Sequence, residues 1–162
     1  MKGGLGTSAI SLPNGVIVAA MIVVNAVGDI VDPATGEIVA GVRTADGRSL
    51  ADARKLLRSD PAIGGRDGEN TTIGVVATNA LLTKAQAKRI AQVAHDGLAR
   101  SIYPSHTPFD GDTLFVLSTG EIDDVDFLTL GALAADMVAE AVLRAVRAAT
   151  GIEGIPAVGD LP

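Results

Sequence analysis

The sequence predicts a mixed α/β fold (α+β), and three observations support this prediction. The segment Val16–Val24 is rich in β-branched residues, which is typical of a strand buried on both faces. Two later segments, 83–102 and 124–150, carry apolar residues at helical spacing. The chain has 162 residues, 48% of them hydrophobic, which suits one compact domain over residues 1–162.

The first part of the chain is predicted to be mostly β. Pro13-Asn14-Gly15 favours a turn, so Ser8–Leu12 is the expected hairpin partner of Val16–Val24. A second turn over residues 32–36 leads into a short strand at Glu37–Val42. A short helix is expected to follow, with Ser49 as its N-cap and its end near Arg58, and then an irregular Gly-rich loop over residues 59–70.

The second part alternates strands and helices. Strands are predicted at Thr71–Ala77 and Thr113–Ser118. Between them, Thr83 and Gln86 form a capping-box pattern that begins a helix reaching Ile102. The last helix is expected to start at Asp124 as N-cap, to end at Thr150-Gly151, and to lie between layers or between subunits, because it is apolar over most of its circumference.

Composition excludes several classes of function. The net charge is −6 and no Lys/Arg cluster is present, so nucleic acid is not an expected partner. The chain has no cysteine, which excludes disulfides and thiolate chemistry. No segment reaches the roughly 20 apolar residues of a membrane span, and no signal-peptide pattern is present, so a cytoplasmic location is expected. Aromatic residues make up only 2%, so the core must consist of Val, Ile, Leu and Ala.

Thr71 opens a predicted strand directly after the Gly-rich loop. The ordinary interpretation is a β-branched residue in a β position. The functional interpretation is that its hydroxyl attacks the Asn70 carbonyl, which would split the chain into 1–70 and 71–162. The new α-amine of Thr71 would have an ordinary pKa of about 7.7–8.0, which suits a general base.

Asp110 and Asp112 stand two positions apart just before a predicted strand. In an extended segment both side chains would point to the same side. They could be ordinary turn residues, oxygen ligands for Mg²⁺ or Ca²⁺, or an anchor for an ammonium group. No further acidic cluster completes a metal site, so neither a metal nor an organic cofactor is expected.

Four other residues carry side chains that could take part in chemistry. Asn25 follows an apolar strand and is either a buried, hydrogen-bonded structural residue or a donor to an oxyanion. Lys2 precedes two glycines and could help to bind an anion, although the pattern does not match a Walker motif. His95 and His106 are too few and too separate in the sequence to indicate a metal site.

Several segments resemble the L-aminopeptidase/D-esterase family, which includes DmpA-type aminopeptidases, β-peptidyl aminopeptidases and a nylon-oligomer hydrolase. The resemblance is carried in order along the chain by Lys2–Ser8 (KGGLGTS), Val24–Gly28 (VNAVG), Asn70–Ala80 (NTTIGVVATNA), Leu82–Gln86 (LTKAQ), Ala94–Arg100 (AHDGLAR) and His106–Thr113 (HTPFDGDT).

This resemblance implies a layered αββα sandwich and a precursor that cuts itself once. Thr71 falls at the nucleophile position and Asn70–Thr71 at the scissile bond, with Thr72 as a weaker rival nucleophile. Asn25 matches the oxyanion-stabilising position, and Asp110 and Asp112 match positions that hold the nucleophile's amine. Lys2 resembles the family lysine near the site. The implied substrates are small peptides, amino-acid amides or oligoamides, and a homo-oligomer is expected.

The resemblance also shows a difference. Family members carry a large segment before the loop at which this sequence begins, so the sandwich is expected to be incomplete. Two alternatives therefore remain beside the self-processing hydrolase. One is a non-catalytic or partner-dependent fragment of such an enzyme, and the other is an acyltransferase resembling ornithine acetyltransferase.

Overall fold

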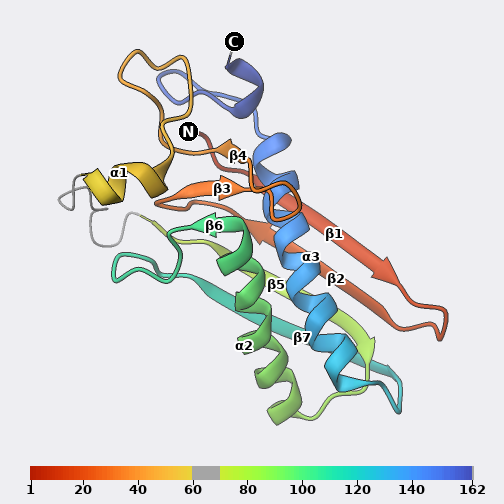
Figure 1. Cartoon of the computed structure of the whole chain (residues 1–162). Coiled ribbons are helices and arrows are strands. Elements are labelled where there is room, and N and C mark those ends of the chain that lie inside the picture. The colour runs from red at the N-terminus through yellow and green to blue at the C-terminus, as the bar shows by residue number, and fades with distance from the viewer. Residues whose placement is uncertain (60–69, 162) are drawn as a thin grey trace.

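One sheet and two long helices form the body of the molecule (Figure 1). The computed structural model describes residues 1–59 and 70–161. The main sheet has four strands in the order β1-β2-β5-β7. Its strands are β1 (Leu5–Ser11), β2 (Ile17–Val23), β5 (Ile73–Ala80) and β7 (Thr113–Ile122). β1, β2 and β5 run antiparallel to their neighbours in that order, whereas β5 and β7 are parallel.

Helices α2 (Lys84–Ser101) and α3 (Phe127–Arg147) cover one face of this sheet and pack against each other. A second, three-stranded sheet lies at one end, in the order β4-β3-β6. It contains β3 (Asp29–Val31), β4 (Ile38–Ala40) and β6 (Ile102–Tyr103). The short helix α1 (Ala53–Ser59) and the 3-10 turn η1 (Val158–Asp160) complete the described elements. The predicted mixed α/β fold is confirmed.

Alternation along the strands explains the layers. In β2, Val18, Ala20 and Ile22 are buried against the helices, whereas Met21 and Val23 are exposed on the opposite face. The core consists of aliphatic side chains and contains no aromatic residue among those described as buried, as the composition predicts. α3 contributes eleven buried residues from its long apolar face, which packs against β1 and β2 and, at its side, against α2.

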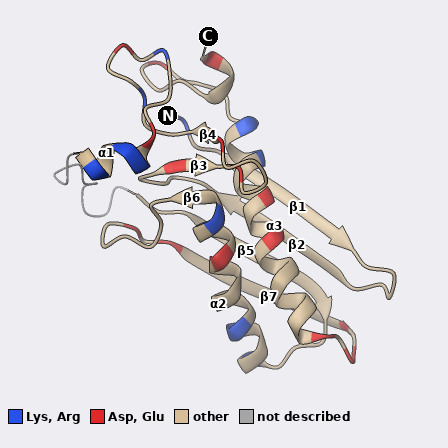
Figure 2. Cartoon of the chain, viewed as in Figure 1, with Lys and Arg blue, Asp and Glu red and all other residues tan. Residues whose placement is uncertain are grey.

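The other face of the main sheet is uncovered. We call it the open sheet face; its exposed hydrophobic residues are Leu5, Ile17, Met21, Val23, Ile73, Phe115 and Leu117. β1, β2 and β5 carry no charged residue, and β7 carries only Glu121 (Figure 2). One helical layer on one main sheet is half of the αββα sandwich that the sequence predicts.

Most predicted elements are present, but several boundaries differ. The hairpin through Pro13-Asn14-Gly15 is confirmed, with Gly15 at φ +86°. The capping box at Thr83 and Gln86 is also confirmed. Most of the loop predicted before Thr71 lies in residues 60–69, outside the described residues.

The predicted caps of two helices are wrong. α1 begins at Ala53 rather than near Ser49, because the buried carboxylate of Asp29 accepts the Ala53 N–H at 2.6 Å. α3 is capped by Asp126, whose carboxylate accepts the Leu128 and Thr129 N–H groups. Asp124 instead adopts a left-handed backbone with φ 52°. The same helix ends with Ala148 as C-cap, three positions before the predicted Gly151.

Candidate active site

Two segments that precede parallel strands lie side by side and bring the predicted site residues together. Asn70 forms a parallel bridge with Asp110, so the segment before β5 continues the pairing of β5 with β7. On the other side, the main-chain carbonyl of Asn25, just beyond the end of β2, accepts the Thr71 N–H at 3.0 Å. Thr71 therefore lies between two neighbours, one from β2 and one from β7.

The predicted scissile peptide Asn70–Thr71 is held at both of its polar groups. Its carbonyl oxygen accepts the Gly111 N–H at 3.1 Å, and its N–H donates to Asn25. Gly111 also lies against the Thr71 hydroxyl: a Cβ at position 111 would be 2.7 Å from Thr71 Oγ1. The absence of a side chain at Gly111 thus leaves room for the Thr71 hydroxyl beside the carbonyl of Asn70.

Thr72 points to the opposite side of the strand from Thr71. Its side chain is fully buried beneath the helices, and its Oγ1 has no hydrogen-bond partner in the structure. A hydroxyl in this position is removed from any substrate that reaches the site from solvent. The geometry therefore favours Thr71 over Thr72 as the nucleophile.

The two aspartates have different partners. Asp112 Oδ1 accepts the Thr72 N–H at 2.7 Å. Burial raises the pKa of Asp112, the Thr72 N–H opposes this, and the neighbouring Asp110 charge raises the pKa further. Asp110 turns into its own loop, where its Oδ2 accepts the Thr107 N–H at 2.9 Å. An extended segment would direct both carboxylates to the same side. In the structure they instead accept hydrogen bonds from different residues, Thr72 and Thr107.

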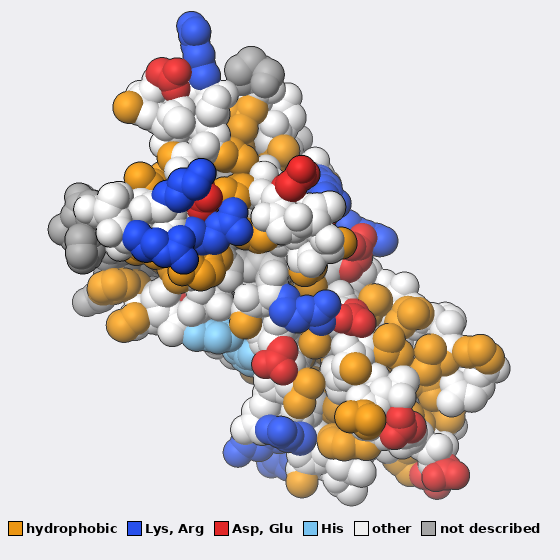
Figure 3. All heavy atoms as spheres, viewed as in Figure 1, with side chains coloured by type: hydrophobic (Ala, Val, Ile, Leu, Met, Phe, Trp, Pro, Cys, Tyr) orange, Lys and Arg blue, Asp and Glu red, His pale blue; other side chains and the backbone are white. Residues whose placement is uncertain are grey.

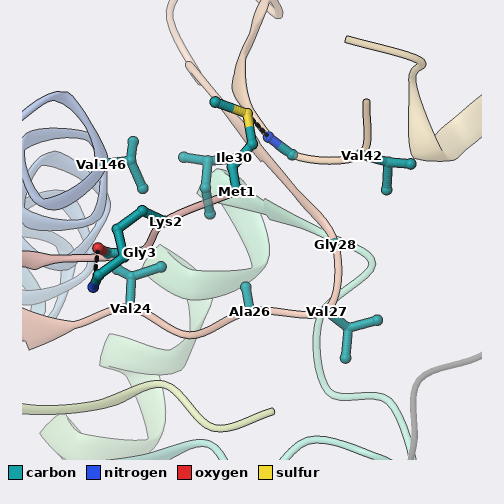
Figure 4. A pocket seen from close by; sticks show the side chains of 11 residues that line it. Met1, Lys2, Gly3, Val24, Ala26, Val27, Gly28, Ile30, Val42 and Val146 are labelled. Atoms are coloured by element: carbon teal, nitrogen blue, oxygen red, sulfur yellow. Dashed lines mark hydrogen bonds between the residues drawn. The ribbon is translucent and has the colours of Figure 1, made fainter. Parts of the chain in front are cut away.

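Asn25 and Lys2 both lie near the end of β2, Asn25 with an exposed side chain and Lys2 beside a cavity. The side chain of Asn25 is exposed, so the interpretation of it as a buried structural residue is wrong. It continues the alternation of β2, in which Val23 is exposed and Val24 is buried. Lys2 Nζ donates to the Gly3 carbonyl at 3.0 Å. Lys2 lines a cavity of about 140 Å³ together with Val24 and Ala26, the two neighbours of Asn25 (Figure 4).

Sequence reasoning missed the histidines. His95 of α2 and His106 of the loop before β7 have ring centroids 5.2 Å apart. Their separation in the sequence hid this contact, because β6 and the following loop reverse the chain direction after α2 ends. Among the described residues, no three His, Asp or Glu side chains converge as metal ligands.

Comparison with known proteins decides the family. Residues 1–158 match the family model described as Peptidase family S58. The chain belongs to this peptidase family. An uncharacterized aminopeptidase of Mycobacterium tuberculosis is 41% identical over 182 residues, covering 99% of this chain and 52% of the relative. A 6-aminohexanoate-oligomer endohydrolase of Kocuria sp. is 30% identical over 153 residues, covering 80% of this chain and 41% of the relative.

Two solved structures have a similar fold. The L-aminopeptidase D-Ala-esterase/amidase of Ochrobactrum anthropi, described as a variant of the Ntn-hydrolase fold, superposes with a TM-score of 0.63. It is 22% identical, and the match covers 96% of this chain and 43% of that chain. A Burkholderia sp. beta-aminopeptidase gives a TM-score of 0.56 at 24% identity, covering 90% of this chain and 42% of that chain. The chain spans about half the length of the curated relatives it matches. None of the helices within residues 1–59 and 70–161 could cross a membrane.

Proposed function

We propose that this chain carries the catalytic centre of a self-processing amidohydrolase or aminopeptidase in which Thr71 is the nucleophile. The observation that carries the proposal is the arrangement of the Asn70–Thr71 peptide. Its carbonyl oxygen accepts from Gly111, its N–H donates to Asn25, and the Thr71 hydroxyl lies beside Gly111. Membership of Peptidase family S58 and the names of the relatives support hydrolysis of amide bonds.

Self-cleavage would proceed by an N-to-O acyl shift. Thr71 Oγ attacks the Asn70 carbonyl carbon, and the negative charge that develops on the oxygen is stabilised by the Gly111 N–H. The C–N bond breaks as the proton from Oγ passes to the Thr71 nitrogen. Water then hydrolyses the resulting ester, which leaves a carboxylate on Asn70 and a free amine and hydroxyl on Thr71.

Turnover would use the same groups on an external amide. The α-amine of Thr71 takes the proton of its own hydroxyl as Oγ attacks the substrate carbonyl, and it gives this proton to the substrate nitrogen as the C–N bond breaks. Water then hydrolyses the ester left on Thr71, which releases the acyl group and restores the hydroxyl.

The main-chain carbonyl of Asn25 accepts the hydrogen bond from the Thr71 nitrogen that becomes this amine. The exposed side chain of Asn25 is the proposed second donor to the oxyanion. Asp112 holds the neighbouring Thr72 N–H and so fixes the strand end. Asp110 shapes the loop that presents Gly111, and Lys2 contributes positive charge from the adjacent cavity.

The proposed substrates follow from the relatives and from this chemistry. They are short peptides with a free N-terminus, amino-acid amides and oligoamides, and no metal or organic cofactor is required for the steps above. The open sheet face supports a second candidate, namely a catalytic half that needs a partner surface before it becomes active.

The intact mass of freshly purified protein tests the proposal. Wild-type chain should give two pieces, 1–70 and 71–162, whereas Thr71→Ala should remain one chain and Thr72→Ala should still be cut. Hydrolysis of amino-acyl p-nitroanilides should require the same residue. A Thr71→Ala chain that is still cut between Asn70 and Thr71 would refute the nucleophile assignment. An uncut wild-type chain would favour the partner-dependent candidate.

A further inference from the structure

The residue before the predicted cut is held by contacts that do not depend on the bond to be cut. Asn70 pairs with Asp110 in a parallel bridge, and its carbonyl oxygen accepts the Gly111 N–H at 3.1 Å. Two residues further along the chain, the Thr72 carbonyl accepts the Thr113 N–H at 3.0 Å in the same way. Asn70 therefore lies on this strand edge as one residue of an extended peptide would.

The proposed nucleophile is held independently of Asn70. The Thr71 N–H donates to the Asn25 carbonyl at 3.0 Å, and the next N–H, that of Thr72, donates to Asp112 at 2.7 Å. β5, which follows, pairs with a strand on each side. Hydrolysis of the peptide bond between Asn70 and Thr71 therefore converts two held groups into a carboxylate and an amine, and it requires neither of their hydrogen bonds to break.

The cut changes the charge at this edge. The Asn70 carbonyl becomes a carboxylate, and a hydrogen bond from an N–H to a carboxylate is roughly twice as strong as one to a neutral carbonyl. The new amine of Thr71 is largely protonated below its ordinary pKa of about 7.7–8.0, and in that form it attracts the carboxylate. The carboxylates of Asp110 and Asp112 repel it, but each of them already accepts a backbone N–H. The Gly111 N–H thus remains the donor for the new chain end.

The same edge is open to ligands from solvent. Gly111 is exposed and Asp110 is half-buried. The loop that carries them also contains His106, and Figure 3 shows the histidine side chains, His95 and His106, together at the surface. The carboxyl group of another peptide can therefore reach the Gly111 N–H whenever Asn70 is away from it.

We propose that the Asp110–Gly111 edge is the binding site for the acyl residue of a substrate, and that Asn70 is its first ligand. Before the cut the site holds the Asn70 carbonyl, and after the cut it holds the Asn70 carboxylate. The freshly cut protein is therefore inhibited by the new end of its own first piece until that end leaves. The ligand class is the terminal carboxylate or the amide carbonyl of an extended peptide residue. This inference rests on the proposed function of Thr71, and it adds the site at which substrate and product compete.

Hydrogen exchange of the Gly111 amide, followed by NMR, tests occupancy of the site independently of activity. Gly111 should be protected in the uncut Thr71→Ala chain and also in processed wild type. Trimming the processed protein with a carboxypeptidase removes Asn70, and the Gly111 amide should then exchange several-fold faster. The Thr113 amide is the internal control, because it donates to Thr72 and needs no contact with Asn70.

Two results of the exchange measurement would overturn the proposal. Rapid exchange of Gly111 in processed but untrimmed protein would show that the site is empty after the cut. Loss of protection at Gly111 and Thr113 together would indicate fraying of the strand end. The Thr71→Ala chain treated with the same carboxypeptidase is the control for trimming at residue 162, and its Gly111 amide should stay protected.

The second test uses rate. Hydrolysis of an amino-acyl p-nitroanilide by the processed protein should become several-fold faster after trimming. An acetylated peptide with the sequence of residues 66–70 should then inhibit competitively, raising KM and leaving kcat unchanged. The same peptide ending in asparaginol lacks the carboxylate and should inhibit several-fold more weakly. Equal inhibition by the two peptides, or no gain of rate on trimming, would refute the proposal.

The intact mass separates failure of this inference from failure of the proposed function. A wild-type chain that stays uncut would refute both, because no carboxylate then forms at Asn70. A chain that is cut and active, but shows no protection of Gly111 and no effect of trimming, would refute this inference alone.

Discussion

At the scale of single residues, the site depends on which way each side chain leaves the strand. Thr71 and Thr72 are adjacent, but alternation directs Thr72 into the helical layer and leaves Thr71 on the side of Ile73. The buried Thr72 hydroxyl lacks a partner in the structure. A buried hydroxyl without a hydrogen bond lowers the free energy of unfolding, so Thr72 is a position at which the native residue reduces the stability of the fold.

Thr72→Val should remove this unsatisfied hydroxyl with little change of shape. We expect the free energy of unfolding to stay equal or to increase by about 1 kcal/mol, measured by chemical denaturation in the uncut Thr71→Ala background. Self-cleavage of the Thr72→Val single variant should persist. Loss of self-cleavage in that variant would instead make Thr72 the chemically active residue.

Gly111→Ala should impair processing through crowding. The new Cβ would lie 2.7 Å from Thr71 Oγ1, so the hydroxyl must move away from its position beside the Asn70 carbonyl. Misplacement by an ångström can cost roughly 10²-fold in rate, so we expect self-cleavage to slow by about tenfold or more. The time course of the uncut band on a denaturing gel measures this. Gly159→Ala, where a Cβ meets nothing within 4 Å, is the control and should behave as wild type.

At the scale of elements, the two long helices approach each other closely at one glycine. A Cβ on Gly97 of α2 would lie 2.3 Å from the Ala135 carbonyl oxygen and 2.8 Å from Val138 Cβ, both on α3. The contact is between backbone and backbone, so it cannot be relieved by a change of rotamer. The spacing of α2 and α3 on the sheet therefore depends on this position.

Gly97→Ala and Gly131→Ala form a matched pair that tests the crossing. Gly97→Ala should destabilise the fold by about 1–3 kcal/mol through overpacking. At Gly131 of α3 the nearest atom to a new Cβ would be Val93 Cγ1 at 3.5 Å, an ordinary contact. Gly131→Ala should be neutral or stabilising by up to about 1 kcal/mol, because alanine favours helix more than glycine. Thermal unfolding of both variants measures the difference, and equal melting temperatures would contradict the close crossing.

Elements with strong local signals could be predicted from the sequence, whereas those held by distant contacts could not. The β-branched run of β2 and the capping box of α2 are local, and both predictions are confirmed. β3 has three residues and β6 has two, which are too short for any periodicity to appear. The start of α1 depends on Asp29, which belongs to another element and accepts the Ala53 N–H.

The same distinction applies to the candidate site. The resemblance placed Thr71, Asn25, Asp110 and Asp112 in one site, and the structure brings these four positions to adjacent strand ends. It could not indicate that Gly111 would donate to Asn70, because that hydrogen bond depends on the register of β5 against β7. The contact between His95 and His106 requires the chain to reverse after α2, so it could not be predicted from the local sequence either.

At the scale of the whole molecule, the open sheet face is the main uncovered apolar surface that the described residues form. Phe115 is 63% exposed and Met21 48%, and the small side chains of Ala9, Ala19 and Ala77 help to form a hollow of about 510 Å³. A face whose exposed side chains are mostly apolar, with such a hollow, is suited to packing against a second apolar layer. We therefore expect the chain to self-associate through this face when it is prepared alone.

Met21→Lys combined with Phe115→Lys should reduce this self-association. Both side chains are exposed, so the folded core should keep its stability while like charges oppose contact between open sheet faces. Sedimentation velocity at several concentrations measures the change. The control is Leu128→Lys on α3, which replaces an exposed leucine on the helical side and should leave association unchanged. Unchanged association in the double variant would place the contact elsewhere.

The pairing of β2 with β5 gives the proposed cut an effect on how the protein can refold. These strands lie on opposite sides of the Asn70–Thr71 bond, as do β3 and β6, and α3 packs on both β1 and β2. Before the cut, refolding is an event within one molecule, at a rate independent of dilution. After the cut, the same ladder must form between two separate chains, so recovery becomes second order in concentration. The proposed cut would therefore make unfolding at low concentration effectively irreversible, because the two pieces can diffuse apart.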